Sequence, residues 1–519
     1  MPEEPSRAGQ GLGWSGSAHL SSYGVSARPV NLVGTLREVL ANPMQPMASA
    51  LTFAERHFQA LWTRWIQNPG TPLSTSIILG WAAGRGLEVL SVEEGQVGAF
   101  HTIPAIMLRT SIGSACFPTM GTSCPSWQRN RAYAEKKARL WEKVEWFSPL
   151  WIAHSNEREL LRDIEASPPD RALGVFNYHA STLYPLGFQA TCLAQLLPAS
   201  KSISVFAPLA REAFLGFYSG SRASSVAALI PVIEGVLKRI YPGMKPKDAA
   251  NKIVDGASAL AAKLYFGEMW APPEFKTTDF LYGLDERVFV FETFRNWLLK
   301  FYFCDINDYR GKTSLNRHIF AHGDSTEWGR SENFSRLVVA IAMLGVIESW
   351  HDGTNSIPVL FPSMNEDSRL LWQQALLRGQ IQHVVQLTEL EAYHASGRLV
   401  PEYPTDGGVT LRTAVLMEDA MKDLVKPLRD AGWSVAIGEP DERALYVLVK
   451  GVRDQESVSV ALLYSCATSN DLYKALAEGN DVILYRGPPF HQASYAYGIS
   501  KHVGPVLGWL PPCPGKERV

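Results

Sequence analysis

The residues best suited to chemistry lie in Ser-Leu-Asn-Arg-His-Ile-Phe-Ala-His-Gly-Asp, positions 314–324, which contains Arg317, His318 and His322. An imidazole can take a proton from a ribose 2′-hydroxyl or deliver one to a leaving oxygen near neutral pH. A permanently charged guanidinium can stabilise the crowded phosphate of the transition state. Arg-x4-His is therefore a combination that can cleave RNA without a metal ion.

The spacing alone is weak evidence, because a chain with this many Arg and 12 His shows Arg-x4-His about once by chance. The three occurrences here are Arg317/His322, Arg378/His383 and Arg486/His491. The third contains Pro488-Pro489, which breaks a helix, and the second has Gly379 after the Arg in an ordinary amphipathic stretch. Context therefore favours the first, which has a polar residue after the Arg and opens a turn between two predicted helices.

Two separated segments resemble one family, the HEPN superfamily (higher eukaryote and prokaryote nucleotide-binding). NRHIFAHG, followed by ENFSRLVVAIAML, is similar to its ribonuclease motif of Arg, a polar residue, three further residues and His. REAFLGFYSGSRASSVAALIPVIEGVL resembles that family's early helices, with a Pro-x-x-Glu-Gly patch at Pro231 to Gly235. The resemblance covers residues 200–352, under a third of the chain.

The resemblance implies an α-helical bundle that forms a homodimer and brings two Arg-x4-His motifs into one cleft. It implies RNA cleavage without metal or cofactor, leaving a cyclic phosphate. Arg317 would bind the scissile phosphate, His322 would be the acid and base, His318 the polar second residue, and Asn316 would support the turn. Many members act in toxin–antitoxin, abortive-infection and other anti-phage systems, and some are inactive binding or scaffold modules.

Two other interpretations of the motif stay open at this point. In a regular helix, positions 317 and 322 lie ~140° apart, whereas 318 and 322 lie ~40° apart, so the two His would share a face. His-x3-His is a metal-ligand spacing, and a third ligand could come from the carboxylates Asp305, Asp308 and Asp324. Alternatively, the Arg and both His are hydrogen-bonded structural residues at a helix start.

Further candidates lie outside the motif. Glu234 is centred in an apolar helix and would need a partner such as an Arg, which favours a structural pair over catalysis. Pro440-Asp441 and a strand ending in Lys450 superficially match a metal nuclease, but no Glu-x-Lys follows. The segment 486–491 is typical of a loop leaving a strand end, where small ligands bind, although no glycine-rich phosphate loop is present. We expect this C-terminal region to sense a ligand or bind a regulatory partner.

Hydrophobic periodicity predicts a mainly α fold with a small C-terminal α/β domain. Helices are predicted at 49–69, 131–147, 207–221, 224–243, 249–265, 286–303, 333–350, 367–397, 411–432 and 471–479, and strands at 87–92, 434–438, 444–450, 457–464 and 481–485. The predicted units are a mobile leader (1–48), a mostly helical N-terminal region (49–195), a HEPN-like helical bundle (196–355), a helical connector (356–405) and an α/β domain (406–519).

The composition sets limits on partners and location. Lys+Arg 49 against Asp+Glu 51 gives a net charge of −2, which argues against a broad nucleic-acid coat and confines any RNA contact to a local cleft. Six Cys without a CxxC pair indicate reduced thiols. The start of the chain lacks a secretory pattern, and the longest apolar run, Leu337 to Ile347, is too short for a membrane span. We therefore expect a cytoplasmic protein without a membrane partner.

Overall fold

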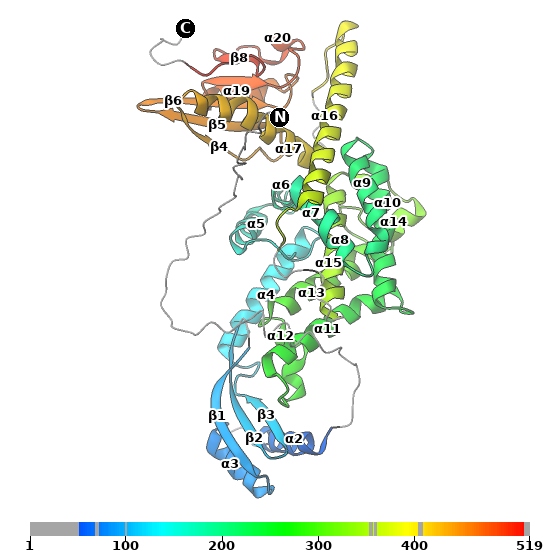
Figure 1. The fold of residues 1–519 in the computed structure, drawn as a ribbon, viewed down its shortest axis with the longest axis vertical. Coiled ribbons are helices and arrows are strands. Elements are labelled where there is room, and N and C mark those ends of the chain that lie inside the picture. Colours follow the sequence, from blue (N-terminus) through cyan, green and yellow to red (C-terminus); the bar gives the residue numbers. More distant parts are fainter. Residues whose placement is uncertain are drawn as a thin grey trace, which may run out of the picture.

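The computed structural model describes residues 51–67, 72–98, 101–351, 357, 361–402 and 408–512. A small sheet lies at one end of an elongated molecule, helices fill the middle, and a larger sheet lies at the other end (Figure 1). The fold is mainly helical with a C-terminal α/β region, as the sequence predicts. The leader predicted at 1–48 lies outside the described residues.

The N-terminal part combines two helices with an antiparallel sheet. Its elements are α2 (Phe53–Ile66), α3 (Thr75–Gly84), β1 (Val89–Val97), β2 (Ile103–Thr110) and β3 (Gly113–Pro118), in strand order β1-β2-β3. A capping box begins α2, in which Thr52 accepts from Glu55 N and the Glu55 side chain accepts from Thr52 N. The sequence predicts α2 and the start of β1, whereas β2 and β3 were not predicted.

The next helices wrap a core rich in aromatic residues. They are α4 (Pro125–Lys143), α5 (His154–Ala166), α6 (Ala172–Leu183), α7 (Leu186–Thr191), the π-helix η1 (Cys192–Leu196), α8 (Leu197–Ala199) and the 3-10 turn η2 (Ser204–Phe206). Trp141, Trp146 and Phe147 are fully buried in this core. Large rings remove much apolar surface from water, so they tie the N-terminal helices to the middle of the molecule.

The middle of the chain forms the predicted helices. They are α9 (Ala207–Tyr218), α10 (Arg222–Ile240), α11 (Pro246–Phe266), the 3-10 turn η3 (Pro273–Lys276), α12 (Thr278–Leu281), α13 (Glu286–Trp297), the π-helix η4 (Leu298–Tyr302), α14 (Arg317–His322), the 3-10 turn η5 (Glu327–Gly329) and α15 (Glu332–His351). Asp285 caps α13 by accepting from Arg287 N and Val288 N. The helices predicted at 207–221, 224–243, 249–265, 286–303 and 333–350 are thereby confirmed.

The long helix α15 runs through the centre of the core. It is long and apolar enough, by length and composition, to cross a membrane, but 89% of its apolar window is buried inside the protein. The run Leu337 to Ile347 is thus a buried helix, as predicted. Its Glu348 carboxylate accepts hydrogen bonds from Ser200 Oγ at 2.5 Å and Ser202 N at 2.9 Å, which satisfies a charge taken from water.

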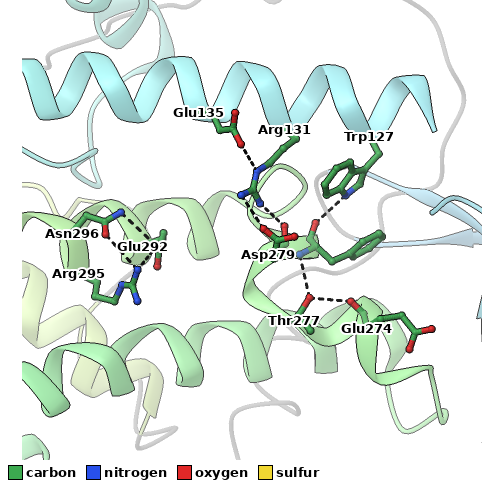
Figure 2. A network of polar contacts seen from close by, with 10 residues as sticks. Trp127, Arg131, Glu135, Glu274, Thr277, Asp279, Glu292, Arg295 and Asn296 are labelled. Carbon is green, nitrogen blue, oxygen red and sulfur yellow. Dashed lines mark hydrogen bonds and ion pairs between the residues drawn. The ribbon is translucent and has the colours of Figure 1, made fainter. Parts of the chain in front are cut away.

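Polar contacts join α4 to the segment containing α12 and α13 (Figure 2). The Arg131 guanidinium lies 2.9 Å from the carboxylates of both Asp279 and Glu135. Trp127 Nε1 donates to the Phe280 carbonyl at 3.1 Å. These bonds fix α4, which leads out of the small N-terminal sheet, against the central helices.

The C-terminal part consists of a long helix and a mixed sheet. Its elements are α16 (Glu366–Ala395), α17 (Val409–Asp419), the π-helix η6 (Ala420–Val425), α18 (Lys426–Asp430), β4 (Ser434–Ile437), β5 (Tyr446–Arg453), β6 (Glu456–Leu463), α19 (Asn470–Gly479), β7 (Val482–Tyr485), α20 (Gln492–Tyr495) and β8 (His502–Pro505). The strand order is β4-β5-β6-β7-β8, with antiparallel pairs up to β6 and parallel pairs from β6 to β8.

Both faces of this sheet are covered. Val460 and Leu462 on β6 belong to the main core, whereas Ala461 and Leu463 pack with α19 on the opposite face. Successive residues of a strand point to opposite faces, so a run of apolar residues is what a doubly covered strand requires. The predicted alternation of strands with the helix at 471–479 is confirmed, and β8 is an addition.

Candidate active site

The motif residues form a six-residue helix with a defined cap at each end. Asn316 caps the start of α14, because its Oδ1 accepts from His318 N at 2.8 Å and Ile319 N at 3.0 Å. Its Nδ2 donates to the carbonyls of Phe301 and Cys304, at 2.6 and 2.9 Å. Gly323 ends the helix at φ 72°, a left-handed conformation that favours glycine. Asn316 therefore fixes the helix to the chain that leaves η4.

Replacing Asn316 with Ala should lower the free energy of unfolding by roughly 2–3 kcal/mol, more than the ~1 kcal/mol of an ordinary cap. The side chain is fully buried, so its loss also leaves two carbonyls without their donor. Urea denaturation measures the effect. Asn365→Ala is the matched control, because Asn365 is an exposed cap, on α16. Equal losses in the two variants would contradict this role of Asn316.

Arg317 is held by a carboxylate from another helix. Its Nε forms an ion pair with Glu234 on α10, and its Nη2 lies 3.5 Å from the same carboxylate. Lys238, one turn along α10, also contacts Glu234, at 2.7 Å. The Glu234 side chain is 11% exposed and that of Arg317 is 36% exposed. Glu234 thus has the Arg partner that a buried carboxylate needs, while part of the guanidinium stays accessible.

The two His lie together on α14, away from the Arg. The rings of His318 and His322 are nearly parallel, at 7°, with centroids 6.4 Å apart. Positions five residues apart on a helix lie ~140° apart around its axis, so Arg317 and His322 of one copy point in different directions. His318 is half-buried, and burial, followed by the charge of Arg317, lowers its pKa. His322 is exposed.

Contacts from a distant helix position the loop before α14. The buried Glu145 carboxylate, just after α4, accepts from Lys312 N at 2.5 Å, Thr313 N at 2.9 Å and Thr313 Oγ1 at 2.7 Å. Asn333 Nδ2 donates to the Thr313 carbonyl at 2.9 Å. Glu145 and Ser314 have positive φ, 54° and 52°, conformations that surrounding contacts must hold. No local pattern identifies Glu145, because its partners lie 167 and 168 residues away along the chain.

The other two Arg-x4-His pairs have different surroundings. Arg378 Nη1 donates to Ser219 Oγ at 3.0 Å, whereas His383 is buried beside Tyr464. Arg486 forms an ion pair with Asp419. The Tyr464 ring contacts His383 of the second pair, and the Arg486 guanidinium of the third pair lies 4.8 Å from the centre of the same ring. The fold therefore brings His383 and Arg486 close together. The second pair lies inside the long helix α16, and the third lies in the segment between β7 and α20, so neither is presented on a short helix capped at both ends as Arg317 and His322 are.

Stability should fall as the pH is lowered from 7 to 5, in part through His383. Burial lowers the pKa of His383 to about 4, whereas the unfolded chain binds this proton near 6.5. The contribution of His383 to the free energy of unfolding is therefore complete above pH 6.5 and is lost as the pH falls toward 4. The loss between pH 7 and 5 is roughly 2 kcal/mol. Urea denaturation of wild type and His383→Gln isolates it, because the other groups titrate in both. Parallel pH profiles would refute the assignment.

The carboxylates proposed as further metal ligands are placed as follows. Asp305 pairs with Lys247 at 3.0 Å, and this hydrogen bond lowers the pKa of Asp305. Asp308 and Asp324 are exposed. Within the described ranges, no three His, Cys, Asp or Glu side chains are grouped to hold a metal ion. The His-x3-His pair thus lacks a third protein ligand among these residues.

Two other features lie apart from α14. Asp441 accepts hydrogen bonds from Tyr446 N at 2.9 Å and Leu445 N at 2.5 Å, so its carboxylate holds the turn before β5. A pocket of about 700 Å³ opens between α11 and the η3–α12 turn, with Lys263, Lys276 and Phe266 in its lining. The motif residues do not line this pocket.

Searches against protein-family models, curated proteins and solved structures find no match to this chain. Functional inference therefore depends on the residues themselves and their geometry.

Proposed function

We propose that the chain is a HEPN-like endoribonuclease that cleaves RNA without a metal ion at a site formed by Arg317 and His322. The observation that carries the proposal is their presentation on α14. The guanidinium is oriented by Glu234 yet partly accessible, and the exposed imidazole ends a helix fixed by Asn316. An active-site cation must be held in one orientation by a neighbouring side chain, and Glu234 holds Arg317 in this way.

In the proposed reaction, the His322 imidazole removes the proton of a ribose 2′-hydroxyl, and the 2′-oxygen attacks the adjacent phosphorus. The bond to the 5′-oxygen breaks and that oxygen takes a proton from the His322 imidazolium, so the imidazole is neutral again. The products are a 2′,3′-cyclic phosphate and a 5′-hydroxyl. Arg317 binds the phosphate oxygens, whose negative charge becomes more crowded in the transition state. His318 lies beside His322 and contributes to the RNA-facing surface.

A second copy of the chain would complete the site. Arg317 and His322 lie ~140° apart around one α14, so one phosphodiester is served more readily by Arg317 of one copy and His322 of the other. This agrees with the homodimer that the family resemblance implies. A local cleft of this kind is also consistent with the net charge of −2, since few phosphate contacts are needed.

The biological setting follows from the resemblance. We place the protein in the cytoplasm, in a toxin, abortive-infection or anti-phage defence role. The C-terminal α/β region would regulate the enzyme by binding a partner or small ligand. The packing of this region supports such regulation, because Val447 and Val460 share one hydrophobic core with α10 and α15.

A second candidate is a catalytically inactive HEPN-like binding or scaffold protein. The Arg317–Glu234 ion pair favours this candidate, because a guanidinium engaged by a carboxylate has less capacity for phosphate. It predicts that the protein binds RNA, or a protein partner, without cleaving RNA.

Incubation of the purified full-length protein with RNA, with and without EDTA, tests the proposal. The expected result is cleavage that survives chelation and leaves 2′,3′-cyclic phosphate ends. Cleavage abolished by EDTA and restored by a divalent cation would contradict the metal-independent mechanism. Binding without cleavage under all conditions would support the scaffold alternative instead.

A further inference from the structure

An open groove of about 600 Å³ runs along α2, at the end of the molecule that carries the small sheet (Figure 1). Arg56, Arg64 and Arg85 line it, together with the amides of Gln59 and Gln67. No carboxylate is among the described residues of its lining. The groove therefore gathers three positive charges in a chain whose net charge is −2. We call it the α2 groove.

One face of α2 forms the groove, and the opposite face packs into the core. A helix turns ~100° per residue, so Arg56 and Arg64 lie ~40° to either side of Ala60. The buried residues of α2 lie ~100° to 160° from Ala60, namely Phe58, Leu61 and Trp62. Glu55, the single acidic residue of α2, lies ~140° from Ala60, and its carboxylate accepts from Thr52 N at 2.7 Å. The positive charges of α2 thus face the groove, and its negative charge does not.

Protein contacts orient these guanidinium groups without using all of their donors. Arg56 Nε donates to the Leu51 carbonyl at 3.1 Å, and Arg85 Nε donates to His57 Nδ1 at 3.4 Å. The terminal nitrogens of both Arg have no acceptor among the described residues. A guanidinium binds a phosphate through two parallel N–H groups, so these exposed groups suit phosphodiesters.

Aromatic rings lie beside these cations. The Arg64 guanidinium lies 5.3 Å from the centre of the Trp81 ring on α3. Phe53 is 70% exposed, and it lies ~20° from Ala60 around α2, on the side of the groove. Its ring contacts that of His57, with centroids 4.7 Å apart. Cations beside an exposed ring are typical of sites for single-stranded nucleic acid, because bases stack on the ring while phosphates bind the cations.

We propose that the α2 groove binds single-stranded RNA, with phosphates on Arg56, Arg64 and Arg85 and a base on Phe53. From Arg56 to Arg64 the helix rises ~12 Å, so one extended strand can contact both cations. α2 lies at the end of the molecule with the small sheet, whereas α14 lies among the central helices (Figure 1). The groove therefore holds a part of the strand away from the scissile bond. The choice of RNA rests on the proposed function, in which α14 cleaves RNA.

Fluorescence anisotropy tests the groove, with full-length protein titrated into a labelled 2′-O-methyl oligouridylate. The methyl group replaces the attacking hydroxyl hydrogen, so the probe binds without being cleaved. Each phosphate contact with a single strand adds about 0.7 to the slope of log affinity against log salt. The triple variant Arg56→Gln, Arg64→Gln, Arg85→Gln should therefore reduce this slope by ~2. Between about 50 and 200 mM salt, wild type should lose roughly 20-fold more affinity than this variant does.

The triple variant Arg158→Gln, Arg162→Gln, Arg369→Gln is the matched control. It removes the same total charge from exposed residues of α5 and α16 and should keep the wild-type slope. Far-UV circular dichroism establishes that both triple variants keep their helices.

Phe53→Ala should weaken binding of the oligouridylate at least about fivefold and leave the salt slope unchanged, because one base loses its stacking partner. Tyr133→Ala is the control, because Tyr133 is 59% exposed on α4 and should bind as wild type does. An effect of the Arg replacements without an effect of Phe53→Ala would overturn the proposal, since the groove would then bind any polyanion. Binding of phosphatidylserine vesicles, but not of RNA, through the groove would overturn it as well.

The groove and the nuclease site can fail separately, because the anisotropy measurement requires no cleavage. If the groove variant kept the wild-type affinity and slope, or lost no more than the Arg control, while wild type cleaved RNA, only the groove would be refuted. Wild type that does not bind the oligouridylate would also refute the groove. Binding that depends on the groove, without cleavage of ordinary RNA, would support the groove and contradict only the nuclease.

Discussion

His322→Ala should lower the rate of RNA cleavage by about 10²- to 10⁴-fold, the range for loss of a general acid or base. Arg317→Ala should lower it by roughly 10²- to 10³-fold, as removal of one stabilising donor does. His322→Ala should lose little stability, because His322 is exposed. Arg317→Ala should lose more, because the buried Glu234 carboxylate then keeps only Lys238 as a partner. Rates measured at saturating RNA separate these losses from weaker binding.

Arg378→Ala and His491→Ala are matched controls for composition and spacing. Each residue belongs to one of the two Arg-x4-His pairs that lie outside α14. Their variants should cleave RNA at the rate of wild type. If the controls lost as much activity as His322→Ala, the assignment of the reaction to α14 would be wrong.

Arg336→Met should lower the free energy of unfolding by roughly 3–5 kcal/mol, because three acceptors lose their buried donor at roughly 1–3 kcal/mol each. Arg336 on α15 is 3% exposed, and burial lowers its pKa to about 10. Its guanidinium donates to the carbonyls of Val144 and Glu145, at 3.3 and 3.2 Å, and to Asn177 Oδ1 at 3.1 Å. Met keeps much of the volume and removes every donor.

The same variant connects stability to the site. Arg336 fixes the backbone at Glu145, and the Glu145 carboxylate holds the loop before α14. Urea denaturation measures the loss, with Arg330→Met as control. Arg330 forms an exposed ion pair with Glu327, so its replacement should cost less than about 1 kcal/mol. Similar values for the two variants would show that the buried network contributes little.

Local patterns predicted much of the fold. The apolar run from Leu337 to Ile347 identified α15 because a helix buried on all sides has few polar positions. The β6 segment was recognised from its β-branched residues. β2 and β3 were not predicted, since Ile103–Thr110 includes Pro104 and a short apolar run does not distinguish a strand from a buried helix.

The site was predicted only in part. Asn316 and Gly323 are local helix signals, and α14 lies between them. The sequence predicted that Glu234 needs a positive partner, but it could not specify Arg317, 83 residues away. Glu145 was missed for the same reason. Contacts between distant segments depend on how helices pack, and hydrophobic periodicity carries no information about which polar side chains then meet.

The most direct test of the central claim mixes two inactive variants. If Arg317 of one copy and His322 of the other form each site, a mixed dimer of Arg317→Ala and His322→Ala retains one intact site. After exchange of subunits, the mixture should recover about a quarter of wild-type cleavage, because half of the dimers are mixed and each has one working site. Recovery of that size, absent from either variant alone, is the predicted result. A mixture as inactive as its components, with exchange shown by differently labelled copies, would contradict a site shared between two copies.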